Sequence, residues 1–176
     1  MKSFKQHILE KLNVSVRNTT KHILFPKTKD ELKQMIKDEI SKNGNECSLN
    51  HIDVSEITDM SELFYGSNFS GDISEWDVSN VKDMKVMFCK SKFNGDISEW
   101  DVSSVKDMTG MFKESKFNGD ISNWDVSNVE NMGRMFAWSE FNGNISNWDV
   151  SSVTNMSYMF YNSPLENNPP KWYKKI

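Results

Sequence analysis

A tandem repeat of 24 residues is the feature that most constrains how this chain can fold. Sliding the sequence against itself aligns a degenerate copy and four close ones, at 45–68, 69–92, 93–116, 117–140 and 141–164. A close copy reads FNGDISNWDVSNVENMGRMF at 117–136 and holds eight large apolar side chains. Because so few side chains cannot enclose a core by themselves, the copies are expected to stack on one another.

Within one copy, the pattern predicts a turn, a short strand, a second turn and a short helix. Trp76 and Val78 lie two residues apart, as on one face of a strand. Val81, Met84 and Met87 follow at the spacing of one helical face, and an Asn or Ser suited to an N-cap precedes each such segment. The expected fold class is therefore α/β, with about five stacked coils.

Stacking identical copies is expected to align identical side chains, so that the core runs as continuous ladders. The predicted core ladders are formed by Trp76, Trp100, Trp124, Trp148, Met84, Met108, Met132, Met156, Phe88, Phe112, Phe136 and Phe160.

Both ends of such an array need caps, because the end layers would otherwise expose the core. Residues 1–44 are predicted as an N-terminal cap, with a helix near 3–12, an extended piece before Pro26 and a helix at 29–41. The second helix begins with the capping-box pattern TKDE and ends at Asn43-Gly44. Residues 165–176 are the predicted C-terminal cap, formed by Leu165, Trp172 and Tyr173.

The charge distribution makes nucleic acid an unexpected partner. Residues 45–164 carry eight Lys or Arg against nineteen Asp or Glu, whereas 1–44 carry ten against five. A nucleic-acid surface needs a basic stripe, and here the largest part of the chain is acidic. No apolar run is long enough to insert in a membrane or to form a signal-peptide core, so a cytoplasmic or phage-associated location is expected rather than export.

No constellation of residues suggests catalysis or a cofactor. The two cysteines, Cys47 and Cys89, form no zinc-binding motif, and no histidine has a second ligand at metal spacing. Each Asp has equivalents in the other copies, whereas an active site needs one distinctive cluster. The chain is therefore not expected to be an enzyme, and no cofactor is expected.

Ladders of aspartates leave two alternatives open. Asp72, Asp96 and Asp120, followed by Asn144, occupy one register, and stacked carboxylates repel unless something offsets the charge. Each Asp could accept hydrogen bonds from turn amides, which is the favoured interpretation, or the ladder could hold calcium between coils.

Function is expected in the positions that differ between copies. The pair after the first Met of the helical segment changes from Lys85-Val86 to Gly133-Arg134. Exposed aromatic residues and Arg accumulate in the last two copies, and such side chains commonly anchor protein interfaces. The predicted partner-binding residues are Arg134, Trp138, Tyr158 and Tyr161.

The repeat FNGDISNWDVSNVxxMxxMF resembles that of the BspA-like leucine-rich-repeat group, also known as the mycoplasma-type lipoprotein repeat. The resemblance covers 69–163 closely and 45–68 loosely. It implies a right-handed leucine-rich-repeat-like solenoid, used for adhesion or protein binding without enzymatic chemistry. By itself the resemblance also implies the cell surface.

The sequence thus predicts a protein-interaction or scaffold module of bacterial or phage origin, with another protein as its partner. The alternative is a calcium-dependent surface adhesin that binds a host protein or glycan.

Overall fold

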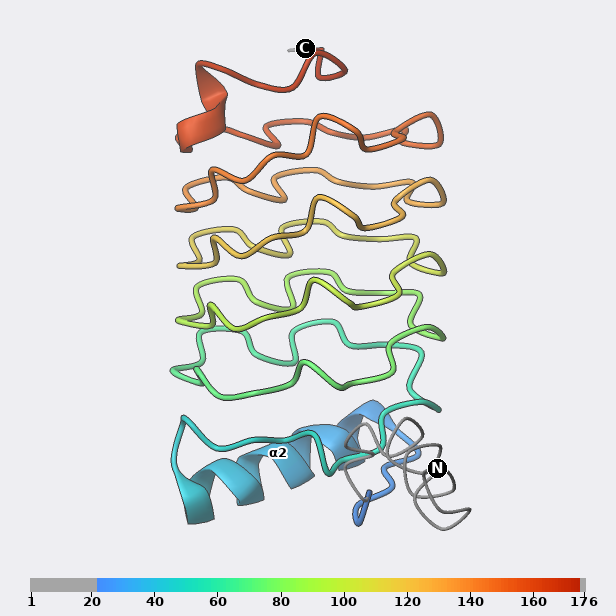
Figure 1. Ribbon diagram of the computed structural model, residues 1–176, viewed down its shortest axis with the longest axis vertical. Helices are drawn as coiled ribbons and strands as arrows, with labels where there is room; N and C mark the ends of the chain where they lie inside the picture. The colour runs from blue at the N-terminus through green and yellow to red at the C-terminus, as the bar shows by residue number, and fades with distance from the viewer. Residues whose placement is uncertain (1–21, 175–176) are drawn as a thin grey trace, which may run out of the picture.

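The computed structural model describes residues 22–174, in which the chain forms flat layers stacked along one long axis (Figure 1). The helix α2 lies across one end of the stack, and the C-terminal segment lies across the other. The helix predicted near 3–12 lies outside the described residues.

The helix α2, Lys29–Asn43, confirms the prediction of a helix at 29–41. Thr28 caps it by accepting a hydrogen bond from the Glu31 amide at 3.2 Å. Its buried residues are Leu32 and Ile36, one turn apart, so this face packs against the first layer. Gly44 ends the helix with φ 85°, in the left-handed region that glycine tolerates.

Successive layers are joined by isolated parallel bridges between residues 24 positions apart. One bridge pairs Ser48 with Asp72, and the longest series continues through Asp59, Asp83, Asp107, Asn131 and Asn155. The copies recognised in the sequence therefore correspond to stacked layers of the chain, seen edge-on in Figure 1.

The predicted fold class is wrong: an α/β leucine-rich-repeat-like solenoid with a strand and a helix in each coil is not what the chain forms. Within residues 22–174 the structure contains α2, one 3₁₀ helix at Pro164–Glu166 and no strand. Residues 73–81, expected to include a strand, bend through consecutive turns in which Trp76 donates to Ile73 O and Val81 to Val78 O.

The short helix expected after Val81 fails to form because its amides bond to the neighbouring layer. The N–H groups of Met84, Val86 and Phe88 donate to carbonyls of the next copy at 2.8–2.9 Å. The intervening Met87 and Cys89 amides donate three residues back, to Met84 O and Val86 O. These bonds use the donors that an α-helix would direct four residues back, so the segment is a chain of turns.

The core lies between the two sides of each layer and runs along the whole stack. Of the predicted ladder residues, all except the half-buried Met156 are buried. Neighbouring Phe rings stack in parallel, with centroids 5.6 Å apart for Phe88 and Phe112. Each indole also donates to the preceding layer, as in the 3.0 Å bond from Trp124 Nε1 to Ile97 O.

The C-terminal segment covers the last layer by continuing its register. Trp172 stands 24 residues after Trp148, stacks on it at 6.4 Å and donates to Ile145 O at 2.9 Å. Leu165 is buried, and Tyr173 packs edge-on against Phe160 at 4.9 Å.

Candidate functional site

The positions that vary between copies lie in a turn with an unusual backbone. Two residues per layer, four positions apart, have positive φ, and in the last complete copies these include Arg134 at 57°, Trp138 at 55° and Tyr158 at 57°. Side chains in this conformation are strained unless the surrounding structure holds them. The same two positions have positive φ in every layer, and their amides donate to the next layer where one follows, as from Arg134 N to Ser157 O. These interlayer hydrogen bonds supply the restraint.

The four predicted binding residues come together at the C-terminal end of the stack. Trp138 and Tyr161 make an edge-on ring contact at 4.9 Å, and Tyr158 and Tyr161 make another at 6.0 Å. The exposed fractions of Trp138, Tyr158 and Tyr161 are 43%, 60% and 45%. We call these three rings together with Arg134 the aromatic cluster.

Two cations contact the rings of the aromatic cluster. The Arg134 guanidinium carbon is 5.7 Å from the centroid of Tyr158, and Lys113 Nζ is 5.3 Å from that of Trp138. Such contacts help to orient the rings. Lys113 Nζ also lies 3.2 Å from Glu114 Oε1, so Arg134 is the cation of this pair for which no ion pair is found among the described residues. Lys113 was not predicted, although it occupies the register of Tyr161 two copies earlier.

A cavity of about 200 Å³ lies beside the aromatic cluster. We call it the Arg134 cavity, and it is lined by Thr109, Gly133, Arg134, Asn155, Ser157 and Tyr158. Thr109, Asn155 and Ser157 were not predicted as site residues. Thr109, Gly133 and Ser157 share one register, so their 24-residue spacing was the available signal.

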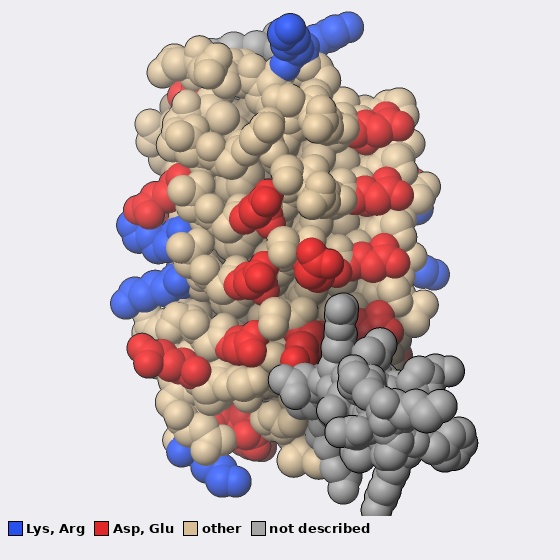
Figure 2. All heavy atoms as spheres, in the orientation of Figure 1, with Lys and Arg blue, Asp and Glu red and all other residues tan. Residues whose placement is uncertain are grey.

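The aspartate side chains close turns, as the favoured interpretation expected. Asp72 Oδ1 accepts from the Ser74 amide and hydroxyl, and Asp96 and Asp120 accept from the amides two residues on. Asn144 Oδ1 keeps the same bond to Ser146 N at 3.1 Å. Figure 2 shows acidic side chains aligned in columns along the stack, as a repeated register requires.

These hydrogen bonds stabilise the ionised carboxylates. Backbone and side-chain hydrogen bonds from Ser98 lower the pKa of Asp96, and those from Ser122 do the same for the pKa of Asp120. Among the described residues, no three His, Cys, Asp or Glu side chains form a group able to hold a metal ion.

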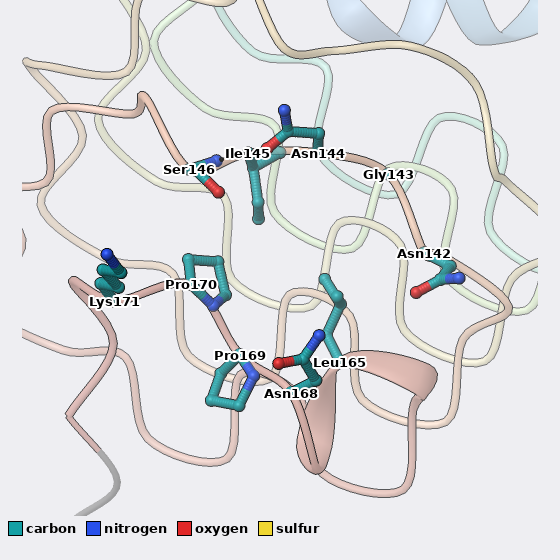
Figure 3. A pocket seen from close by; sticks show the side chains of 10 residues that line it. All are labelled: Asn142, Gly143, Asn144, Ile145, Ser146, Leu165, Asn168, Pro169, Pro170 and Lys171. Atoms are coloured by element: carbon teal, nitrogen blue, oxygen red, sulfur yellow. Dashed lines mark hydrogen bonds between the residues drawn. The ribbon is translucent and has the colours of Figure 1, made fainter.

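Two further pockets lie at the ends of the stack. One of about 300 Å³ lies between Asn142–Ser146 and the C-terminal segment, and Figure 3 shows Ile145 and Leu165 pointing into it from opposite walls. The other, of about 320 Å³, lies between α2 and the layer containing Phe64 and Tyr65. Neither contains a predicted site residue.

Each histidine of the described residues lies beside a carboxylate. His22 lies 3.5 Å from Asp53, and His51 lies 3.4 Å from Glu39. Burial raises the pKa of the Cys47 and Cys89 thiols, which keeps them protonated near neutral pH.

Between residues 22 and 174, no helix has the length and apolar character needed to cross a membrane.

Searches of curated proteins and of solved structures returned no match. One family matches twice, over residues 30–139 and 92–174, and the overlap of the two matches reflects the tandem copies. The match does not single out the BspA-like group. It covers most of the sequence, and the chain therefore belongs to the family described as Mycoplasma protein of unknown function, DUF285.

Proposed function

We propose that this protein is a non-enzymatic binding module that holds a protein partner on the aromatic cluster. The observation that carries the proposal is that Tyr161 contacts both Trp138 and Tyr158, that Arg134 contacts Tyr158, and that all three rings are exposed. Large aromatic side chains and Arg supply most of the binding energy in protein interfaces. The repeat's resemblance to the BspA-like group, which serves adhesion and protein binding, points the same way.

The backbone supports a preformed surface. Trp138 N donates to Tyr161 O at 2.8 Å, and Arg134 N donates to Ser157 O at 2.9 Å. These hydrogen bonds between two layers fix the backbone that carries the cluster. A surface fixed before binding loses less conformational freedom when the partner arrives.

Register-matched substitutions test the proposal with little disturbance of the backbone. Trp138→Asn introduces the residue that stands at Asn162, Tyr158→Gly the one at Gly110, and Tyr161→Ala the one at Ala137. The control variant carries Glu62→Gly, Tyr65→Ala and Lys90→Asn, which make equivalent changes near the opposite end.

The full chain and both variants would be used to capture proteins from the cell that naturally makes this chain, followed by mass spectrometry. A protein retained by the wild type and the control variant would then be titrated calorimetrically against all three chains. We expect the triple cluster variant to lose at least about thirtyfold in affinity with an unchanged melting temperature. Equal affinity for all three chains would contradict the proposal, and a lower melting temperature would assign the rings a structural role.

A further inference from the structure

We propose that the Arg134 cavity receives the carboxylate of an acidic side chain, Glu or Asp, from the protein bound on the aromatic cluster. This inference rests on the proposed function and adds to it the chemistry of the partner. The cavity adjoins the cluster directly, because Arg134 and Tyr158 belong to both.

One residue of the cavity lining, Gly133, lacks a side chain. The register of Gly133 holds Lys85, Thr109 and Ser157 in other copies. A Cβ atom at Gly133 would lie 3.1 Å from Asn155 Nδ2 and 3.3 Å from Asn131 Oδ1, so a residue without a side chain lets the Asn155 amide lie this close to the backbone. Asn155 Oδ1 already accepts from Ser157 N at 3.0 Å, which leaves Nδ2 as the group available to a ligand.

A change of charge accompanies the missing side chain. The register of Asn155 is acidic in the first three copies, at Asp59, Asp83 and Asp107, and becomes neutral at Asn131 and Asn155. The same copies introduce Arg134, where earlier copies have Val86 and Gly110. Two negative charges are therefore replaced by amides where a guanidinium appears, and this combination favours an anionic group.

The hydroxyl of Thr109 is a further, independent indication. Its Oγ1 is buried and is the one buried side-chain polar atom in the described part of the chain that has no hydrogen-bond partner. A buried donor without an acceptor is destabilising, and an oxygen acceptor in the cavity would relieve that cost. With Arg134 and Asn155 Nδ2, the cavity is lined by donors, which suits a carboxylate and disfavours an ammonium group.

A matched pair of peptides tests the chemistry directly. The ¹⁵N-labelled full chain would be titrated with acetyl-Glu-Glu-Glu-amide and, separately, with acetyl-Gln-Gln-Gln-amide, while the Gly133 amide signal is followed by NMR. We expect a saturable shift of Gly133 with the glutamate peptide and an affinity at least about tenfold weaker for the glutamine peptide. Equal responses to both peptides, or no shift at Gly133, would overturn the inference.

Asn155→Asp is the decisive variant, because Asp is the residue of this register in three other copies and can keep the turn bond to residue 157. We expect Asn155→Asp to lower the affinity for the glutamate peptide by at least about tenfold, and Arg134→Gln to lower it to the same extent. The control Asp83→Asn makes the reverse change in a distant layer and should leave the affinity unchanged. Unaltered affinity in Asn155→Asp would contradict the assignment.

The inference and the proposed function can fail separately. Trp138→Asn lies in the cluster but not in the cavity lining. Loss of partner capture in this variant, combined with no peptide response at Gly133, would refute the carboxylate site and leave the proposed function standing. A specific peptide response with unchanged partner capture would refute the binding role of the cluster and support the site.

Discussion

The two ends of the stack close the same core in different ways. At the N-terminal end, α2 buries Leu32 and Ile36 against the first layer. At the C-terminal end, a segment that continues the repeat register stacks Trp172 on Trp148. Both solutions cover apolar rings, so closing the core does not by itself explain what each end displays to solvent.

The charged groups show the difference more clearly. At the N-terminal end Lys29 Nζ lies 3.2 Å from Asp59 Oδ1, and Lys27 binds Glu56 at 2.6 Å. At the C-terminal end Arg134 lies against Tyr158, and the register of Asp59 has become Asn155. The cations at the N-terminal end are thus paired with carboxylates, whereas Arg134 contacts an aromatic ring. This contrast agrees with the proposal of a binding surface at the C-terminal end.

The largest expected effect concerns the N-terminal end. Leu32→Ala should lower the free energy of unfolding by about 2–5 kcal/mol, because it removes a fully buried side chain and leaves a cavity under α2. Urea denaturation followed by circular dichroism measures this, with the exposed Ser41→Ala as the control in the same helix. A loss below about 1 kcal/mol would mean that α2 is not needed to close the first layer.

The indole ladder allows the middle and the C-terminal end to be compared with one substitution. Trp124→Phe should cost about 1–3 kcal/mol, because it removes a buried indole and its hydrogen bond, and the Ile97 carbonyl keeps only the 3.2 Å bond from Trp100 N. Trp172→Phe should cost about 0.5–1.5 kcal/mol, since Trp172 is half-buried and water can replace its bond to Ile145 O. Unfolding curves that shift equally would show that the C-terminal segment is as essential as a central layer.

Two glycines with positive φ separate backbone strain from steric contact. Gly66 and Gly110 have φ of 63° and 60°, but only at Gly110 would a Cβ meet a neighbour, Val86 Cγ1 at 3.0 Å. Gly66→Ala should cost about 1 kcal/mol from the left-handed backbone alone. Gly110→Ala should cost up to about 1 kcal/mol more, because the tight contact must relax. Thermal melts of both variants test this order, and a larger loss for Gly66→Ala would contradict it.

A smaller effect is expected from acid. The hydrogen bonds that lower the pKa of Asp96 and Asp101 below 3.8 stabilise the fold above that pH. This stability is lost as the pH falls through the lower, folded-state pKa values, and the exposure of these carboxylates keeps the change to a few degrees. Asn144 replaces Asp in the last copy. Hydrogen exchange can be measured at pH 6 and pH 3 and expressed as protection relative to the unfolded chain. The protection of amides around Asn144 should therefore change less between the two pH values than that of amides around Asp96.

Calcium is expected to have no effect. Asp72 Oδ1 and Asp96 Oδ1 are occupied by serine donors, so the ladder does not need a cation to offset its repulsion. Melting curves with excess chelator and with added Ca²⁺ should superimpose. A difference of several degrees would restore the calcium-dependent alternative.

The elements that could be predicted from the sequence are those set by local chemistry. The helix at 29–41 was readable because Thr28, Glu31 and the apolar stripe lie within a few residues of one another. The prediction of a helix after Val81 was wrong, because the apolar spacing of this segment also suits a chain of turns. Bonds to a carbonyl one copy away decide between the two, and those bonds are not local.

Of the candidate site, too, only part could be predicted from the sequence. Arg134, Trp138, Tyr158 and Tyr161 stood out as differences between copies, without any information on distances. The role of Thr109 and Asn155 depends on which side chains surround Gly133 in neighbouring layers. Their positive neighbour Arg134 was visible in the sequence, but the close approach of the Asn155 side chain to Gly133 was not.

The interlayer hydrogen bonds of the turns that vary between copies also give that side of the stack an electrical polarity. One column begins with Phe64 N bonded to Met87 O, continues from Phe88 N to Met111 O and reaches Phe136 N and Met159 O. Every bond in it points the same way, so the peptide dipoles add and polarise one another, as they do along a helix. The positive pole falls at the C-terminal end, where Asn162 N already binds the Glu166 carboxylate at 2.7 Å. A column on another part of the layers, from Lys106 N to Lys82 O and from Glu130 N to Lys106 O, points the other way, so the positive pole is local to the turns that carry Arg134.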